Sequence, residues 1–156
     1  MQGGSLEAVR FERFITLLEG IRKNIGRMKE NAVPSFGIKS VHIMWLYRLS
    51  MHDEGLTAAE LAAASTVDRS LVSREISALK KNGYIDTVDT SSKRGYKARW
   101  CLTDKGREVA EKIQELALRI QEKAGEGIEP EKLASFYETL ELLHANFARL
   151  VASEEM

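Results

Sequence analysis

The segment between residues 57 and 102 constrains the fold of this chain more than any other part. Residues 57–60, Thr-Ala-Ala-Glu, have the spacing of a capping box and open a short helix. A second helix is expected over residues 68–82, because an Asp can cap its start and Asn-Gly ends it. Apolar and polar residues then alternate around a basic turn at residues 91–95, which predicts a two-stranded hairpin. Two helices joined by a short turn and followed by a hairpin form a winged helix-turn-helix.

Helical patterns cover most of the remaining sequence, because apolar residues recur there at intervals of three and four. The predicted helices cover residues 6–28, 38–52, 104–124 and 130–151, with Pro34 and Gly37 ending the first region. We therefore expect a mainly α protein with a small wing hairpin, in which a winged helix-turn-helix lies between N- and C-terminal dimerisation helices. Within one compact domain, the expected parts are the N-terminal dimerisation helix (residues 1–37), the winged lobe (38–102) and the C-terminal dimerisation helices (103–156).

Charge is distributed unevenly along this chain of 156 residues, whose formal net charge is zero. Residues 67–99 include eight basic and four acidic residues, whereas residues 126–156 include two basic and seven acidic residues. A basic centre in an otherwise neutral protein is typical of a local phosphate-binding surface. The single cysteine excludes an intrachain disulfide, and the sequence shows neither a secretory leader nor an apolar run of the roughly 20 residues that span a membrane. We therefore expect a cytoplasmic protein.

The second of the two short helices is the element that such folds insert into the DNA major groove. Its N-terminal half carries two arginines and two serines on one face, opposite an apolar face. Small hydroxyl groups allow close approach, and arginine donates two parallel hydrogen bonds to guanine or phosphate. The alternative is an ordinary solvated surface, but the position on a helix-turn-helix favours DNA. The predicted DNA-contacting residues, including those of the hairpin, are Arg69, Ser70, Ser73, Arg74, Lys80, Lys93, Arg94 and Lys97.

Three motifs of this sequence resemble the MarR (multiple antibiotic resistance regulator) family. They are LAAASTVDRSLVSR at residues 61–74, LKKNGYI at residues 79–85 and LTDKG at residues 102–106. The long helices on either side also match the family, so the resemblance covers essentially the whole chain. It implies a homodimeric repressor or activator on a pseudo-palindromic operator, often released by a small aromatic or phenolic ligand.

Two residues depart from the pattern of the MarR family. Thr66 lies in the turn where the family usually has glycine, and a β-branched residue is disfavoured at positive φ. In the hairpin, Ser92 stands in place of the aspartate that braces the arginine entering the minor groove. We still expect Arg94 to make the wing contact, with Asp89 as the substitute brace in a slightly longer hairpin.

The apolar faces of the outer helices exceed what a small winged helix can cover. We expect the faces within residues 6–28 and 133–151 to bury each other across a two-fold axis, because a monomer would leave a large apolar patch exposed. Two recognition helices about 34 Å apart would then match one turn of DNA. The alternative is that these residues form the core of a single protomer. The predicted interface residues are Phe14, Leu17, Ile21, Phe136, Leu140, Leu143, Phe147 and Leu150.

The resemblance also implies an effector site between the dimer helices and the DNA-binding lobe, for which core packing is the alternative interpretation. The candidate residues are Phe36, His42, Trp45, Tyr47 and Arg48. No cofactor is expected. The spacing of His42, His52 and His144 is not that of a zinc motif, so no metal site is predicted. Cys101, on a hairpin strand, is interpreted as a structural residue rather than a redox switch.

Other classes of function fit the sequence less well. An enzyme needs a nucleophile with its base, a phosphate-binding loop or a metal cluster, and no such motif is recognisable. A winged helix that binds only other proteins would present an apolar or acidic recognition face, whereas this face carries arginine and serine. The sequence therefore favours a non-enzymatic homodimer, a repressor or an activator, that binds double-stranded DNA. The alternative is a winged-helix protein-interaction module without sequence-specific DNA binding.

Overall fold

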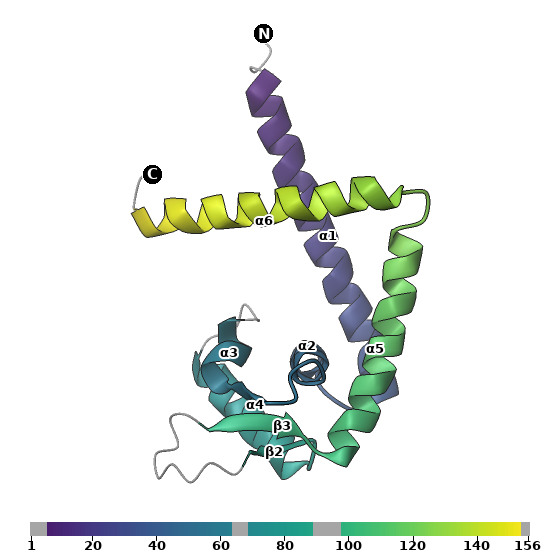
Figure 1. Ribbon diagram of the computed structural model, residues 1–156, viewed down its shortest axis with the longest axis vertical. Coiled ribbons are helices and arrows are strands. Elements are labelled where there is room, and N and C mark those ends of the chain that lie inside the picture. Colours follow the sequence, from purple (N-terminus) through teal and green to yellow (C-terminus); the bar gives the residue numbers. More distant parts are fainter. Residues whose placement is uncertain (1–5, 64–68, 89–97, 154–156) are drawn as a thin grey trace. The chain divides into compact units, whose positions relative to one another are not determined.

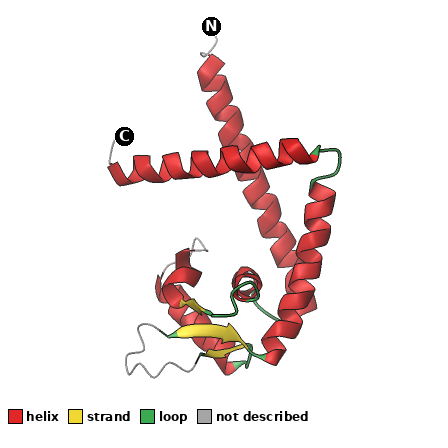
Figure 2. Ribbon diagram, viewed as in Figure 1, coloured by secondary structure: helices red, strands yellow, loops and turns green. Residues whose placement is uncertain are grey.

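The computed structural model describes residues 6–63, 69–88 and 98–153, without the side chain of Arg69. Within these residues the chain forms helices and a small sheet, and it divides into two compact units, Met1–Gln114 and Glu115–Met156 (Figure 1; Figure 2). The elements are α1 (Leu6–Phe36), α2 (Ser40–Leu49), β1 (Leu56–Thr57), α3 (Ala58–Ala63), α4 (Arg69–Lys81), β2 (Ile85–Thr87), β3 (Arg99–Leu102), α5 (Asp104–Ala124) and α6 (Pro130–Ser153). The predicted fold class, mainly α with a small sheet, is confirmed.

The core of the first unit is built from the apolar sides of α2, α3, α4, β2 and the start of α5. Trp45 and Leu46 of α2 are fully buried, together with Leu61 of α3 and Leu79 of α4. Ile113 of α5 is also buried. Because α2 is apolar on most of its circumference, it lies at the centre of this core, as the sequence predicts.

The three strands form an antiparallel sheet in the order β1-β3-β2. In the central strand β3, Trp100 pairs with Leu56 of β1 and Leu102 pairs with Ile85 of β2. Strands β2 and β3 are the predicted hairpin strands. The sequence did not reveal β1, because two residues are too few to show an alternating pattern. The turn between β2 and β3, and the turn that contains Thr66, lie outside the described residues.

Helix α1 is longer, and α2 shorter, than the sequence pattern predicts. Pro34 does not end α1, because it lies in the last turn and removes only one helical hydrogen bond. The helix ends at Phe36 and is followed by Gly37, whose φ of 64° suits glycine and whose N–H donates to the Val33 carbonyl at 3.1 Å. Helix α2 ends at Leu49, after which the His52 N–H donates to the Leu49 carbonyl at 3.3 Å in a tighter turn.

The second unit consists of the end of α5, a short connection and α6. The Ile128 N–H donates to the Gly125 carbonyl at 3.0 Å, so the connection reverses directly after α5. Pro130 begins α6, as predicted, and no residue of that helix is buried. Among the helices that the structure describes, none has the length and apolar character needed to cross a membrane.

Candidate nucleic-acid interface

The helix-turn-helix begins with the capping box that the sequence predicts. The Thr57 hydroxyl accepts a hydrogen bond from the Glu60 N–H at 3.2 Å, and the Glu60 carboxylate accepts one from the Thr57 N–H at 2.7 Å. The hydrogen bond from the Thr57 N–H and, second, one that the Thr57 hydroxyl donates to the same carboxylate at 2.9 Å lower the pKa of Glu60 below its ordinary value. The reciprocal pair defines the start of α3, whose Leu61 is buried in the core.

Helix α4 has one polar exposed face and one buried face. Ser70, Ser73 and Arg74 are exposed, as the sequence predicts, and so is Ser77. Within the exposed face, the Ser77 hydroxyl donates to the Ser73 carbonyl at 2.9 Å. The buried face consists of Val72, Glu75, Ile76 and Leu79. The start of α4 therefore presents small hydroxyls and a guanidinium to solvent on a helix whose other side is packed into the core.

Lys80 joins the end of α4 to the sheet. Its ammonium lies 3.2 Å from Asp86 Oδ1 of β2 and 5.5 Å from the centre of the Trp100 ring of β3. The Thr87 backbone N–H and, second, the Lys80 ammonium lower the pKa of Asp86. Lys80, predicted as a DNA contact, is thus also a link between the recognition helix and the hairpin.

Arg99 attaches β3 to the turn that precedes β1. Its Nε donates to the Glu54 carbonyl at 3.0 Å, and its Nη2 donates to the Gly55 carbonyl at 2.7 Å. Nη2 also lies 3.8 Å from the Glu60 carboxylate. Arg99 belongs to the basic segment of the sequence, but its guanidinium holds the hairpin strand β3 against this turn. The predicted wing contacts Lys93, Arg94 and Lys97 lie outside the described residues, as does the side chain of Arg69.

A partly buried ionic cluster, which we call the Glu75 cluster, consists of Lys39, His42 and Glu75. Lys39 Nζ donates to the two carboxylate oxygens of Glu75 at 2.8 and 2.9 Å, and His42 Nε2 lies 2.8 Å from Oε2. The hydrogen bond from Lys39 contributes most to lowering the pKa of Glu75, whereas burial lowers the pKa of His42. At neutral pH the neutral imidazole therefore donates from Nε2 to an ionised carboxylate. Sequence reasoning missed this cluster, because Glu75 lies more than thirty residues from Lys39 and His42 in the sequence.

The residues predicted for an effector site have different environments. Trp45 is fully buried in the core, and His42 is occupied by the Glu75 cluster, with its ring 6.2 Å from that of Trp45. Phe36, Tyr47 and Arg48 are half-buried. The Arg48 Nε atom is buried and has no hydrogen-bond partner among the described residues.

The other histidines and the cysteine lie in separate places. His52 Nδ1 lies 3.1 Å from the Glu54 carboxylate, and His144 is exposed on α6. The half-buried Cys101 donates from Sγ to the Asp86 carbonyl at 3.5 Å. The described parts of the chain contain no group of three or more His, Cys, Asp or Glu side chains arranged to hold a metal ion.

The predicted dimerisation residues form apolar faces on α1 and α6. On α1, Leu17 is 57% exposed and Ile21 is 51% exposed. On α6, Phe136 and Phe147 are exposed, with the Phe136 ring 5.7 Å from that of Tyr137. Phe14, Leu140 and Leu143 are half-buried and Leu150 is exposed. Each unit thus presents large apolar side chains to solvent, which a soluble monomer rarely does on this scale.

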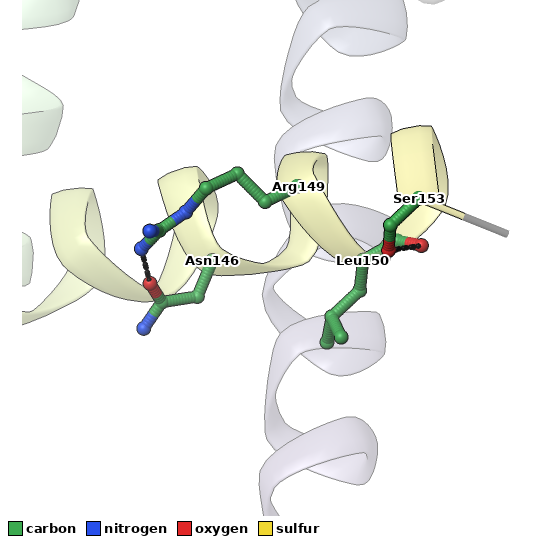
Figure 3. A pocket seen from close by; sticks show the side chains of 4 residues that line it. All are labelled: Asn146, Arg149, Leu150 and Ser153. Atoms are coloured by element: carbon green, nitrogen blue, oxygen red, sulfur yellow. Dashed lines mark hydrogen bonds between the residues drawn. The ribbon is translucent and has the colours of Figure 1, made fainter. Parts of the chain in front are cut away.

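A shallow hollow lies on the surface of α6 (Figure 3). Its lining residues, Asn146, Arg149, Leu150 and Ser153, all belong to this one helix. The Arg149 guanidinium donates to the Asn146 side-chain oxygen, and the Ser153 hydroxyl donates to the Leu150 carbonyl at 3.2 Å. Both hydrogen bonds therefore join residues of the hollow itself.

Comparison with known proteins agrees with this geometry. A family model described as a helix-turn-helix domain matches residues 43–97, which include α3, α4 and the sheet strand β2. No curated protein matches the sequence. The matched segment is therefore a helix-turn-helix domain, and strands β2 and β3, which follow α4, give it the sheet of a winged helix.

Solved structures of MarR regulators share this fold over most of their length. A MarR family transcriptional regulator from Silicibacter pomeroyi has 23% identity and a TM-score of 0.73, covering 83% of this chain and 86% of that one. MarR of Staphylococcus aureus in complex with salicylate and kanamycin has 15% identity and a TM-score of 0.73, with 95% of both chains covered. The S. aureus MepR–DNA complex has 18% identity and a TM-score of 0.65, covering 89% of this chain and 94% of that one. The chain has the MarR fold, which confirms the resemblance at the level of structure.

Proposed function

We propose that this protein is a homodimeric, sequence-specific DNA-binding transcriptional regulator of the MarR type. Helix α4 would read base edges in the major groove, and the wing would contact the adjacent minor groove. The observation that carries this proposal is the exposed face of Ser70, Ser73 and Arg74 on a helix whose opposite side is buried. Small hydroxyls beside a guanidinium suit close approach to bases and phosphates, and a DNA complex is known for MepR, which shares the fold.

The remaining parts of the proposal concern assembly and control. The apolar faces of α1 and α6 support a homodimer, because association would remove large exposed side chains from water. We assign residues 1–37 and 103–156 to dimerisation and residues 38–102 to DNA binding. Release by a small aromatic or phenolic effector is supported by the salicylate complex of a protein with the same fold. Repression and a cytoplasmic location belong to the same proposal.

Selection of bound duplexes from a random pool tests the proposed function. Purified protein is incubated with random double-stranded DNA at near-physiological salt, and the bound duplexes are sequenced. We expect an inverted repeat with half-site centres about 10 bp apart, because two-fold related recognition helices read half-sites that lie one turn of DNA apart. Binding without any enriched sequence would reject sequence-specific regulation and favour general DNA binding. Absence of binding would favour a protein-interaction module.

Arg74→Ala is expected to weaken binding to the selected operator by about 1–3 kcal/mol if the guanidinium reads a base. Binding to random DNA should change much less, because that binding depends on phosphate contacts. Fluorescence anisotropy with operator and random duplexes measures both effects. The matched control is Arg119→Ala, which removes an exposed arginine from α5. An equal loss on the two duplexes would instead make Arg74 a phosphate contact.

A further inference from the structure

We infer that Glu75 is a positioning residue for DNA recognition: held by Lys39 and His42, it sets the rotation of α4 and thus the direction of Ser73 and Arg74. Glu75 directly follows Arg74 in the sequence but is turned inward, with only 10% of its side chain exposed. The residue that fixes the helix is therefore next to a residue proposed to read DNA. This inference rests on the proposed function, and it adds which interaction orients the side chains that would read the DNA sequence.

The Glu75 cluster differs from the rest of the buried face in being directional. Val72, Ile76 and Leu79 make apolar contacts, which tolerate small rotations and slips of a helix. The Glu75 carboxylate instead accepts hydrogen bonds from two side chains at 2.8 to 2.9 Å. A rotation of α4 by about 30° would move a group at the helix surface by about 3 Å, since the helix with its side chains has a radius of about 5–6 Å. That displacement breaks these hydrogen bonds, so the cluster opposes the rotation.

The other half of the cluster is anchored in the backbone at the start of α2. Lys39 is the N-cap residue of α2, and its carbonyl accepts a hydrogen bond from the His42 N–H at 2.9 Å. Helix α1, which carries one of the exposed apolar faces, ends at Phe36, three residues before Lys39. The cluster thus connects the recognition helix α4 to the short segment that joins α1, the proposed dimerisation helix, to α2. The spacing of two recognition helices in a dimer would depend on this connection.

Charge alone predicts the opposite effect of the same residue on DNA binding. Removing a carboxylate near DNA reduces repulsion from the phosphates and should raise the affinity for any duplex. If Glu75 positions α4, its removal should instead lower the affinity for the operator. The direction of the change therefore separates a positioning role from simple electrostatics.

Glu75→Gln is the first test. The amide keeps the shape of the side chain and one oxygen that can accept from His42, but it loses the charge that holds Lys39. We expect the affinity for the selected operator to fall about tenfold, comparable to the loss of a base contact, while the affinity for random DNA stays the same or rises. Fluorescence anisotropy measures both affinities, and thermal denaturation confirms that the variant is folded. The control is Glu108→Gln, which removes an exposed carboxylate from α5.

Substitution of Lys39 gives a second test that does not depend on the folding of the first variant. Lys39 is 63% exposed, so Lys39→Met should leave the core intact. We expect Lys39→Met to lower the affinity for the operator more than the affinity for random DNA, and Lys39→Arg to restore the affinity for the operator. The effects of Lys39→Met and Glu75→Gln on operator affinity should be non-additive, because the two residues act through one interaction. If Lys39 were itself a phosphate contact, both affinities would fall and the log–log salt slope would shrink by about 0.9.

The outcomes distinguish this inference from the proposed function. If the wild-type protein selects no sequence, the proposed function fails and the inference fails with it. If the wild-type protein is specific but Glu75→Gln and Lys39→Met both keep its ratio of operator to random affinity, the positioning role is rejected and the proposed function stands. A lower ratio of operator to random affinity in both variants, with the wild-type ratio restored in Lys39→Arg, supports the positioning role.

Discussion

Phe147→Asp is expected to convert the proposed dimer into monomers. Phe147 lies within the apolar face of α6, with Leu140 two turns before it and Val151 one turn after it. In a two-fold dimer the substitution places two unpaired carboxylates in the interface. Leaving an uncompensated charge buried costs about 3 kcal/mol or more for each copy. The dimer dissociation constant should therefore rise by about ten-thousandfold, which sedimentation velocity at micromolar protein detects.

Ala145→Asp is the matched control for this substitution. Ala145 is exposed and lies on the opposite side of α6 from Phe147, so it introduces the same charge on the same helix outside the proposed interface. We expect this variant to sediment like the wild-type protein. A wild-type monomer, or a Phe147→Asp variant that still forms the wild-type dimer, would show that this face of α6 is not the interface.

Loss of the dimer has a consequence for operator binding. A monomer contacts one half-site, so it loses the effective concentration that a second, linked recognition helix supplies. Phe147→Asp should therefore bind an inverted repeat no more tightly than an isolated half-site, although α4 is unchanged. Anisotropy titrations of both duplexes with the same variant measure this difference.

The parts of the site that the sequence predicted depend on interactions within a few residues. The capping box joins Thr57 to Glu60, three residues apart, and the structure shows both of its hydrogen bonds. The exposed face of α4 likewise follows from helical spacing, because Ser70, Ser73 and Arg74 must share one side if residues 69–81 form a helix. Local geometry of this kind can be predicted from the sequence without knowing what packs against the helix.

The roles of the other charged residues depend on partners that are distant in the sequence. Lys80, Arg99 and Arg74 contribute equally to the basic character of the central segment, yet their surroundings differ. Lys80 pairs with Asp86, and Arg99 donates to backbone carbonyls some 44 residues away. Glu75 counts as one acidic residue in the sequence, but the fold places it between Lys39 and His42. These pairings join α4 to β2, β3 to the turn before β1, and the start of α2 to α4, and apolar periodicity does not predict which of these segments meet.

Gly106→Ala is expected to destabilise the protein although it lies in a helix, where alanine is normally the better residue. The first turn of α5 packs closely against the chain that follows α4. The Thr103 hydroxyl donates to the Gly83 carbonyl at 2.6 Å and accepts from the Gly106 N–H at 3.1 Å, while the Thr103 N–H donates to the Tyr84 carbonyl at 3.1 Å. Lys105 adds a hydrogen bond to the Asn82 carbonyl at 2.8 Å. These contacts hold the backbone of residue 84 directly against Gly106.

A Cβ atom at Gly106 would overlap the carbonyl oxygen of Tyr84, and a backbone atom cannot swing aside as a side chain can. We expect the free energy of unfolding to fall by about 1–3 kcal/mol or more, the usual cost of forcing extra volume into a packed site. The control is Gly26→Ala in α1, where a Cβ meets nothing within 4 Å and the gain in helix propensity should stabilise the protein by about 1 kcal/mol. Urea denaturation of the two variants should therefore give shifts of opposite sign. Equal stabilisation by both substitutions would mean that α5 does not begin against Tyr84, and hence that the end of the recognition helix is not held by the LTDKG motif.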